Sequence, residues 1–98
     1  MADDPYEGRE KDAVGARLEL SRQAVGLDQR TFARNAGIKS STYNQYETGK
    51  NMPQIAAAHA LCDSYRLSLD WIYRGEMSGL PQQVHSAIAA VRRLRKSP

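Results

Sequence analysis

Hydroxyl and amide side chains recur at helical spacing in the middle of the chain. Positions i, i+3, i+4 and i+7 of one predicted helix hold Ser41, Asn44, Gln45 and Thr48. Residues at this spacing share a helical face, which here would be polar and uncharged. Amides can pair with adenine through two hydrogen bonds and hydroxyls can bond several bases, so the face suits base edges in a DNA major groove. An ordinary amphipathic surface helix carries the same pattern, and the face alone does not distinguish the two interpretations.

Two short helices that meet at a sharp corner, over residues 29–47, would position this face. Ala33 is small enough to let the second helix approach the first closely. Gly37 supplies the left-handed backbone that ends a helix at low steric cost, and Ile38 fills the corner. The second helix is expected to begin at about Ser40. The other face of that helix carries side chains that a core could hold, namely Tyr43, Tyr46 and Glu47.

A set of spaced residues extends the corner into a longer pattern. It comprises Leu27-Asp28-Gln29, Ala33, Gly37-Ile38, Ser41-Thr42-Tyr43, Tyr46-Glu47-Thr48-Gly49-Lys50 and Pro53. This order resembles the helix-turn-helix of the phage-repressor-like DNA-binding proteins, the XRE or Cro/cI type, in register from about residue 14 to residue 72. The resemblance implies an all-α fold, with a compact five-helix domain that binds double-stranded DNA.

The resemblance also implies roles for individual side chains. The residues expected to read bases are Ser40, Ser41, Asn44 and Gln45. The residues expected to contact phosphate are Gln29, Lys39, Thr48, Lys50 and Asn51. Gln29 follows Asp28, a good N-cap, and so lies in a first helical turn that favours anions. Arg22 is expected to pair with Glu47 and tie the recognition helix to the first helix.

The loop at residues 48–51 carries a glycine and a lysine that suit an anion. Gly49 permits a positive φ, which would turn successive backbone N–H groups toward a phosphate, and Lys50 adds charge. An ordinary turn before a helix that starts at Pro53 would use the same residues. The two descriptions are compatible.

Two positions depart from the family pattern. Ser21 stands where a larger apolar residue is common, so either a neighbour fills the space or the core is thinner there. Lys39 stands where a capping serine or threonine is usual. Ser40 or Ser41 would then cap the recognition helix, which leaves open which serine reaches a base.

The core is expected to come from inward stripes on two longer helices. The first helix, over about residues 13–25, has the stripe Val14, Leu18, Ser21 and Val25. The fourth helix, over about residues 53–65, has the stripe Ile55, Ala58, Leu61, Cys62 and Tyr65. Ser68 is expected to cap a short last helix that closes the core through Leu69, Trp71 and Ile72. The predicted DNA-binding domain spans residues 12–74.

The net charge of +3 is unevenly spread over the 98 residues. Residues 1–12 carry five acidic and two basic side chains, and the remainder carries +6. A basic body suits a polyanion. Residues 1–11 lack apolar periodicity and are interrupted by Pro5 and Gly8, so we expect a flexible acidic arm that is either simply solvated or shields the body from non-specific DNA.

Several classes of protein are disfavoured. The lone Cys62 allows no internal disulfide, and neither a signal peptide nor a membrane span is visible, so a cytoplasmic, nucleoid-associated location is expected. His59 and Cys62 could be two metal ligands, but a metal site needs more and His85 is distant in sequence. We therefore expect no metal and no cofactor. No nucleophile with a base, paired carboxylates or Gly-rich phosphate loop predicts an enzyme.

The C-terminal part reads as a linker over residues 75–81 and a helix over residues 82–96. Its apolar positions repeat at intervals of 4, 3, 4 and 3, with one residue widening the stripe; they are Leu80, Val84, Ala87, Ile88, Val91 and Leu94. This seam is too short for a free coiled coil, so it must pack on the body of its own chain or on a second copy. Pairing with a second copy is the favoured expectation, which makes the seam a dimerisation surface.

These features together predict a sequence-specific DNA-binding transcriptional regulator of the repressor type. As a homodimer it would read a pseudo-palindromic operator in the major groove. The alternative is an antitoxin-like or adaptor module whose protein partner packs on the helix at residues 80–96.

Overall fold

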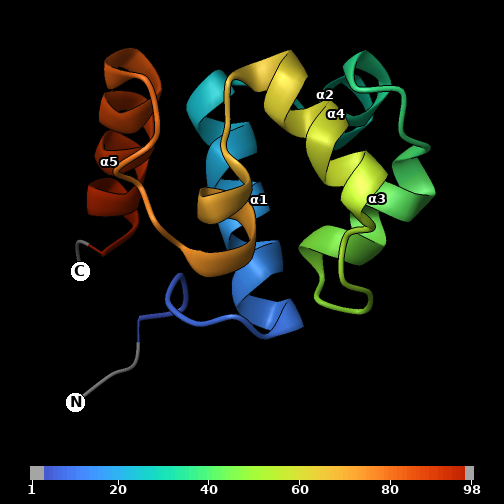
Figure 1. Cartoon of the computed structure of the whole chain (residues 1–98), viewed down its shortest axis with the longest axis horizontal. Coiled ribbons are helices and arrows are strands. Elements are labelled where there is room, and N and C mark those ends of the chain that lie inside the picture. The colour runs from blue at the N-terminus through green and yellow to red at the C-terminus, as the bar shows by residue number, and fades with distance from the viewer. Residues whose placement is uncertain (1–3, 97–98) are drawn as a thin grey trace.

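The computed structural model describes residues 4–96, which form six helices and the turns between them (Figure 1). The helices are α1 Lys11–Val25, α2 Gln29–Asn35, α3 Ser40–Glu47, α4 Ile55–Tyr65, the short π-helix η1 Asp70–Arg74 and α5 Gln82–Lys96. These residues contain no strand, so the predicted all-α class, with a five-helix body and a C-terminal helix, is confirmed. None of the helices in this range is both long and apolar enough to cross a lipid bilayer.

The central element is α1, which lies between α3 and α5 and also contacts η1 (Figure 1). Its fully buried apolar side chains are Val14, Leu18 and Leu20. The predicted stripe fails at Val25, which is 44% exposed, and the stripe of α4 fails at Ile55, which is 56% exposed. Each is a terminal residue of its helix, where little of the body remains to cover it. The fourth helix begins at Ile55, two residues after the predicted Pro53.

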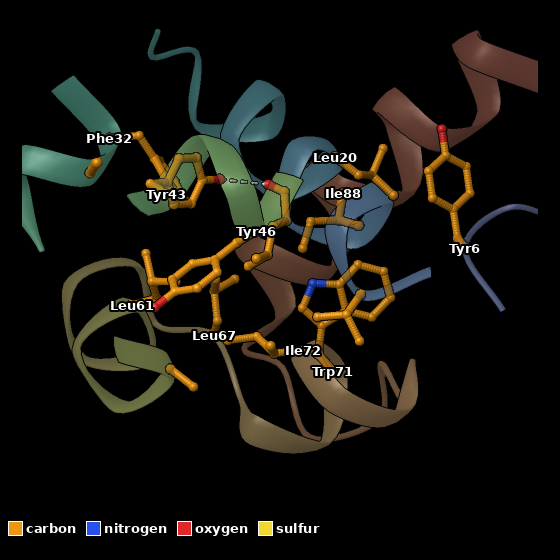
Figure 2. Close-up of a cluster of buried hydrophobic side chains, with 14 of the residues drawn as sticks. Tyr6, Leu20, Phe32, Tyr43, Tyr46, Leu61, Leu67, Trp71, Ile72 and Ile88 are labelled. Carbon is orange, nitrogen blue, oxygen red and sulfur yellow. Dashed lines mark hydrogen bonds between the residues drawn. The ribbon is translucent and has the colours of Figure 1, made fainter. Parts of the chain in front are cut away.

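Trp71 lies fully buried in the core (Figure 2), and its indole packs on the small side chain of Ser21. The indole Nε1–H donates to the Ser21 Oγ at 2.8 Å, and that hydroxyl donates to the Arg17 carbonyl at 2.8 Å. A larger apolar residue at position 21 would displace the indole and leave its N–H without a partner. The first departure from the family pattern is therefore matched by a neighbour on the side of Trp71, while Ser21 also lines a small apolar groove between α1 and α5.

Arg17 of α1 is completely buried. Its guanidinium donates to the carbonyls of Trp71 at 2.8 Å and Ile72 at 2.9 Å, within η1. It also donates to the carbonyls of Tyr6 at 2.7 Å and Gly8 at 2.8 Å, in the segment before α1. One side chain thus joins three parts of the chain that are separate in sequence. The sequence does not mark Arg17 as a core residue, because a buried arginine is rare without an acidic partner.

Residues 4–10 differ from the predicted flexible arm, whose residues 1–3 lie outside the described range. Tyr6 is 6% exposed, and the Arg92 guanidinium lies 5.2 Å from the centre of its ring. Asp4 forms an ion pair with Arg92 at 2.7 Å. An apolar ring and a charge pair therefore hold this segment against α5, and α1 begins at Lys11, two residues before the predicted start.

The apolar seam of the C-terminal helix faces the chain's own body. Leu80 and Ile88 are buried in the core, and Val84 and Val91 pack against it. Leu94 is the exception, because it is 74% exposed. The structure thus shows the alternative in which α5 packs on α1, and most of the seam needs no second copy to cover it. Residues 75–81, where the sequence predicts a linker, form no regular helix, and Leu80 joins the core.

We predict that Arg17→Met destabilises the fold strongly. Methionine is similar in length but donates no hydrogen bonds, so the carbonyls of Tyr6, Gly8 and Ile72 would lose the Arg17 donor, at about 1–3 kcal/mol each before relaxation. The Trp71 carbonyl would keep its hydrogen bond from the Gly75 N–H. The free energy of unfolding, from urea titration followed by circular dichroism, should fall by at least about 3 kcal/mol. Arg34→Met, at an exposed arginine of α2, is the matched control and should change it little. Equal effects of the two substitutions would contradict the role assigned to Arg17.

Candidate nucleic-acid interface

The two faces of α3 differ as predicted. Tyr43 is fully buried, Tyr46 is 5% exposed and the Glu47 side chain is 4% exposed. On the other side, the exposed residues are Ser40, Ser41, Asn44 and Thr48, with Gln45 half-buried. The core therefore holds α3 by its aromatic side while the amides and hydroxyls face outward.

The start of α3 is not fixed by a side-chain cap. The N-cap is Lys39, in extended backbone with φ −61° and ψ 138°, and no side-chain capping bond is present. The helix begins at Ser40, so neither of the two serine caps that the sequence allowed is formed. The hydroxyls of Ser40 and Ser41 are left exposed at the first turn, and the Lys39 side chain is exposed beside them.

α3 lies directly against α1 at Gly15. A Cβ atom at this position would come within 2.5 Å of the backbone carbonyl oxygens of both Tyr46 and Glu47. Real side chains do not approach so closely, so only glycine allows this contact. The position of the recognition helix relative to α1 therefore depends on the absence of a single methyl group.

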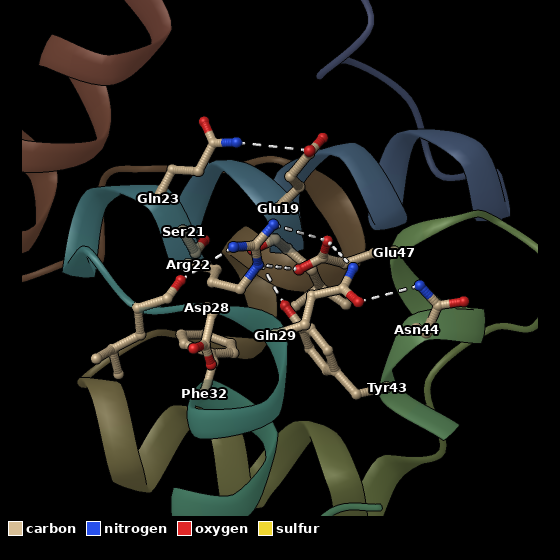
Figure 3. A network of polar contacts seen from close by, with 12 residues as sticks. Glu19, Ser21, Arg22, Gln23, Asp28, Gln29, Phe32, Tyr43, Asn44 and Glu47 are labelled. Carbon is tan, nitrogen blue, oxygen red and sulfur yellow. Dashed lines mark hydrogen bonds and ion pairs between the residues drawn. The ribbon is translucent and has the colours of Figure 1, made fainter. Parts of the chain in front are cut away.

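Arg22 and Glu47 form the ion pair that the sequence placed between these helices (Figure 3). Arg22 donates from Nε to Glu47 Oε2 at 2.7 Å and from Nη2 to Oε1 at 3.2 Å. Its Nη1 donates to the Leu27 carbonyl at 2.9 Å, next to the start of α2. The hydrogen bonds to Glu47 raise the pKa of Arg22. One arginine therefore fixes α1, the α1–α2 turn and the end of α3 together.

Gln29 extends this pair to the exposed face of α3 (Figure 3). Its Nε2 donates to Glu47 Oε1 at 2.8 Å, and its Oε1 accepts from Asn44 Nδ2 at 3.1 Å. The side chain predicted to contact phosphate is thus bonded within the protein to a residue predicted to read a base. Spacing did not signal this contact, because the two residues lie on different helices.

The loop after α3 differs from the predicted backbone clamp. The N–H groups of Thr48, Gly49, Lys50 and Asn51 all donate to carbonyls in the last turn of α3. They therefore close the helix and are not free to bind an anion. Asn51 also donates from Nδ2 to Gln45 Oε1 at 2.6 Å. What the loop offers outward is side chains, chiefly the exposed Lys50.

Lys11 is a basic residue that sequence reasoning assigned to the flexible arm and so missed. In the structure it opens α1, and its Nζ donates to the Lys50 carbonyl at 3.5 Å. The two lysines thus lie at the same loop, where Asp12 also lies against Gly49. Beside the Arg22–Glu47 pair that ends α3, the charged side chains at this loop are therefore the two lysines and Asp12. Its basic balance could be found only from the fold.

No metal centre is visible among the described residues, which contain no group of three or more histidine, cysteine or acidic side chains able to hold an ion. Burial raises the pKa of the half-buried Cys62 thiol. The thiol therefore behaves as a small core group.

The geometry agrees with comparisons to known proteins. Residues 13–71, which run from the first turn of α1 to the start of η1, match the model of the family described as helix-turn-helix domain. The chain belongs to this helix-turn-helix family. This chain is also 28% identical over 69 residues to a protein from Rhodospirillum rubrum, which is named an uncharacterized transcriptional regulator in ATPase CF(0) region. That match covers 70% of this chain and 64% of the relative, so the chain spans less than two thirds of the relative's length. No solved structure matches it.

We predict that Gly15→Ala loosens α3 from α1. Alanine favours a helix by up to about 1 kcal/mol, but the clash with two backbone carbonyls should outweigh this gain and lower the free energy of unfolding by about 1–3 kcal/mol. Urea titration would measure the change. Gly79→Ala is the control, because a Cβ there meets nothing within 4 Å. A stabilised Gly15→Ala protein would show that the close contact is not real.

We predict that the N-cap of α2 makes stability depend on acid pH. The Asp28 carboxylate accepts from the Thr31 N–H at 2.7 Å, which lowers the pKa of Asp28 below its ordinary 3.8. The cap's contribution is therefore complete above the ordinary pKa and is lost as pH falls through the lower folded value. Asp28→Asn keeps a capping oxygen that does not titrate. Between about pH 5 and pH 2, the urea midpoint of the wild type should fall further than that of the variant, and parallel curves would contradict the assignment.

Proposed function

We propose that this protein is a sequence-specific double-stranded DNA-binding transcriptional regulator of the repressor type. The observation that carries the proposal is the outer face of α3, where amides and hydroxyls are exposed on a helix whose opposite side is held by Tyr43 and Tyr46. Family membership supports DNA binding by this helix. The proposed place of action is the cytoplasm, on chromosomal DNA.

The proposed contacts fall into two groups. The residues proposed to read bases are Ser40, Ser41, Asn44 and Gln45. The residues proposed to contact phosphate are Lys39, Thr48, Lys50, Asn51 and, through its backbone N–H in the first turn of α2, Gln29. Phosphate contacts set the position of the helix and base contacts set the sequence that it prefers.

We also propose that the protein acts as a homodimer. A single small domain buries little surface on DNA, whereas a two-fold pair can place two recognition helices about 34 Å apart, on successive turns of the major groove. The proposed interface is the outer edge of the apolar seam, where Leu94 is exposed and Val84, Ala87 and Val91 are only partly covered. The expected operator is a pseudo-palindrome.

One observation favours a second candidate, a protein-interaction module. An apolar groove of about 170 Å³ runs between α1 and α5, lined by residues that include Ala24, Val25 and Val84. Val25 and Leu94 are both exposed apolar side chains on these two helices. An antitoxin-like or adaptor protein would dock its partner on this side of the molecule.

Selection from a randomised duplex pool, with sequencing and with affinity followed across salt concentration, tests the proposal. We expect a pseudo-palindrome with half-sites about one helical turn apart. Asn44→Ala or Gln45→Ala should cost about 1–3 kcal/mol and relax preference at one position. Lys50→Ala should weaken all sequences alike and reduce the salt slope by about 0.9.

Gln82→Ala, on α5, is the matched control for loss of an amide. Unchanged sequence preference in the double variant of Asn44 and Gln45 would refute the proposed reading face. Failure to enrich any sequence would favour the interaction module.

A further inference from the structure

A chain of hydrogen bonds leads from Arg22 through Glu47 and Gln29 to Asn44. The charges of Arg22 and Glu47 determine which group donates and which accepts at each step. A guanidinium only donates and a carboxylate only accepts, so Arg22 and Glu47 can pair in one sense. The Gln29 amide next in the chain contacts Glu47 Oε1 at 2.8 Å. Only its Nε2 can make that contact, because a carbonyl oxygen placed there would face the carboxylate. The pair lies largely out of solvent, because the Arg22 side chain is 14% exposed and the Glu47 side chain 4% exposed.

The orientation of Gln29 then determines the orientation of Asn44. With Nε2 on Glu47, the Gln29 Oε1 points toward Asn44 and accepts from Nδ2 at 3.1 Å. An asparagine amide can usually be placed either way round, but here the reverse placement would bring two oxygens together. Asn44 therefore presents its Oδ1, an acceptor, on the exposed side of α3, together with the second Nδ2 hydrogen.

Gln45 provides the contrast within the same face. Its Oε1 accepts from Asn51 Nδ2 at 2.6 Å, and both partners are neutral amides. Exchanging the roles of donor and acceptor would preserve that hydrogen bond, so nothing in the pair fixes which end of Gln45 faces outward. Of the two amides on this face, Asn44 is the one that Gln29 connects to the Glu47 carboxylate, which sets its direction.

We propose that Arg22, Glu47 and Gln29 act as positioning residues that make Asn44 select adenine, an inference that rests on the proposed function. Adenine presents an N6 amino donor to Oδ1 and an N7 acceptor to the remaining Nδ2 hydrogen. Guanine and thymine present only acceptors in the major groove at these positions, and would face the Asn44 oxygen unfavourably. Cytosine supplies one donor and can satisfy only half of the pattern.

The test uses the site recovered by selection, in which the position read by Asn44 is the one relaxed by Asn44→Ala. We expect adenine there. Purine lacking the 6-amino group and 7-deaza-adenine each remove one partner of the Asn44 amide. Each should weaken wild-type binding about five- to tenfold and have little effect on Asn44→Ala. Because the base analogues require no substitution of Arg22, Glu47 or Gln29, this experiment tests the inference even where a variant at one of those positions folds poorly.

Gln29→Met tests the chain of hydrogen bonds that leads from Arg22 through Glu47 and Gln29 to Asn44. Methionine keeps the length of the side chain and loses its hydrogen bonds. Preference for adenine at that one position should fall to about threefold or less, with the salt slope unchanged. A role in phosphate binding alone would instead weaken all sequences uniformly. Gln23→Met is the matched control, because Gln23 also donates to a carboxylate, Glu19 at 3.5 Å, but lies on α1 away from this face.

The outcomes separate the inference from the proposed function. Recovery of no preferred sequence would refute the proposed function, and the inference with it. Recovery of a defined site with guanine or thymine opposite Asn44, or insensitivity to removal of the 6-amino group, would overturn the inference alone. Retained preference for adenine in Gln29→Met would show that Gln29 does not position Asn44.

Discussion

The buried guanidinium of Arg17 is the interaction on which the arrangement of this chain most depends. Its planar fork of donors joins carbonyls of η1 to carbonyls of the segment before α1. Burial lowers the pKa of Arg17, while the negative charge of Glu10 opposes that shift. A charge removed from water is costly unless its hydrogen bonds are satisfied, so the carbonyls must stay where they are. The indole of Trp71 is likewise held by a hydrogen bond, to Ser21 of α1. Helix α1 is therefore the central axis on which the rest of the domain packs.

Two contacts of opposite kind hold the recognition helix on that axis. At Gly15 the backbones of α1 and α3 approach because no side chain intervenes. Near the end of α3, the Arg22 and Glu47 pair adds a directional bond that is largely shielded from solvent. Steric contact sets the distance between the helices and the ion pair sets their register. The same pair continues through Gln29 to Asn44, so the group that fixes the helix also orients a side chain on its exposed face.

The C-terminal helix shows how one apolar pattern can serve two partners. Its seam covers α1, and the segment around Tyr6 packs beside it. This burial satisfies most of the hydrophobic driving force within one chain. Of the exposed apolar side chains left over on these helices, Val25 lines the groove between α1 and α5, and Leu94 lies in the last turn of α5. A dimer formed through these residues would add an interface to a domain whose core is already covered within one chain.

The sequence alone determined the helices and the outward face of α3, because helical periodicity, Asp28 as a cap and Gly37 as a stop act locally. It also paired Arg22 with Glu47, through a family pattern. It could not determine contacts between residues far apart in the chain. Nothing in the sequence marks Arg17 as buried, Tyr6 lies in a stretch predicted as a flexible arm, and the seam could pack either on its own body or on a second copy. Their environments arise only when α1, η1 and α5 come together. Gln29 likewise has its neighbours decided by the angle between α2 and α3, so only the tertiary structure could show which way the Asn44 amide points.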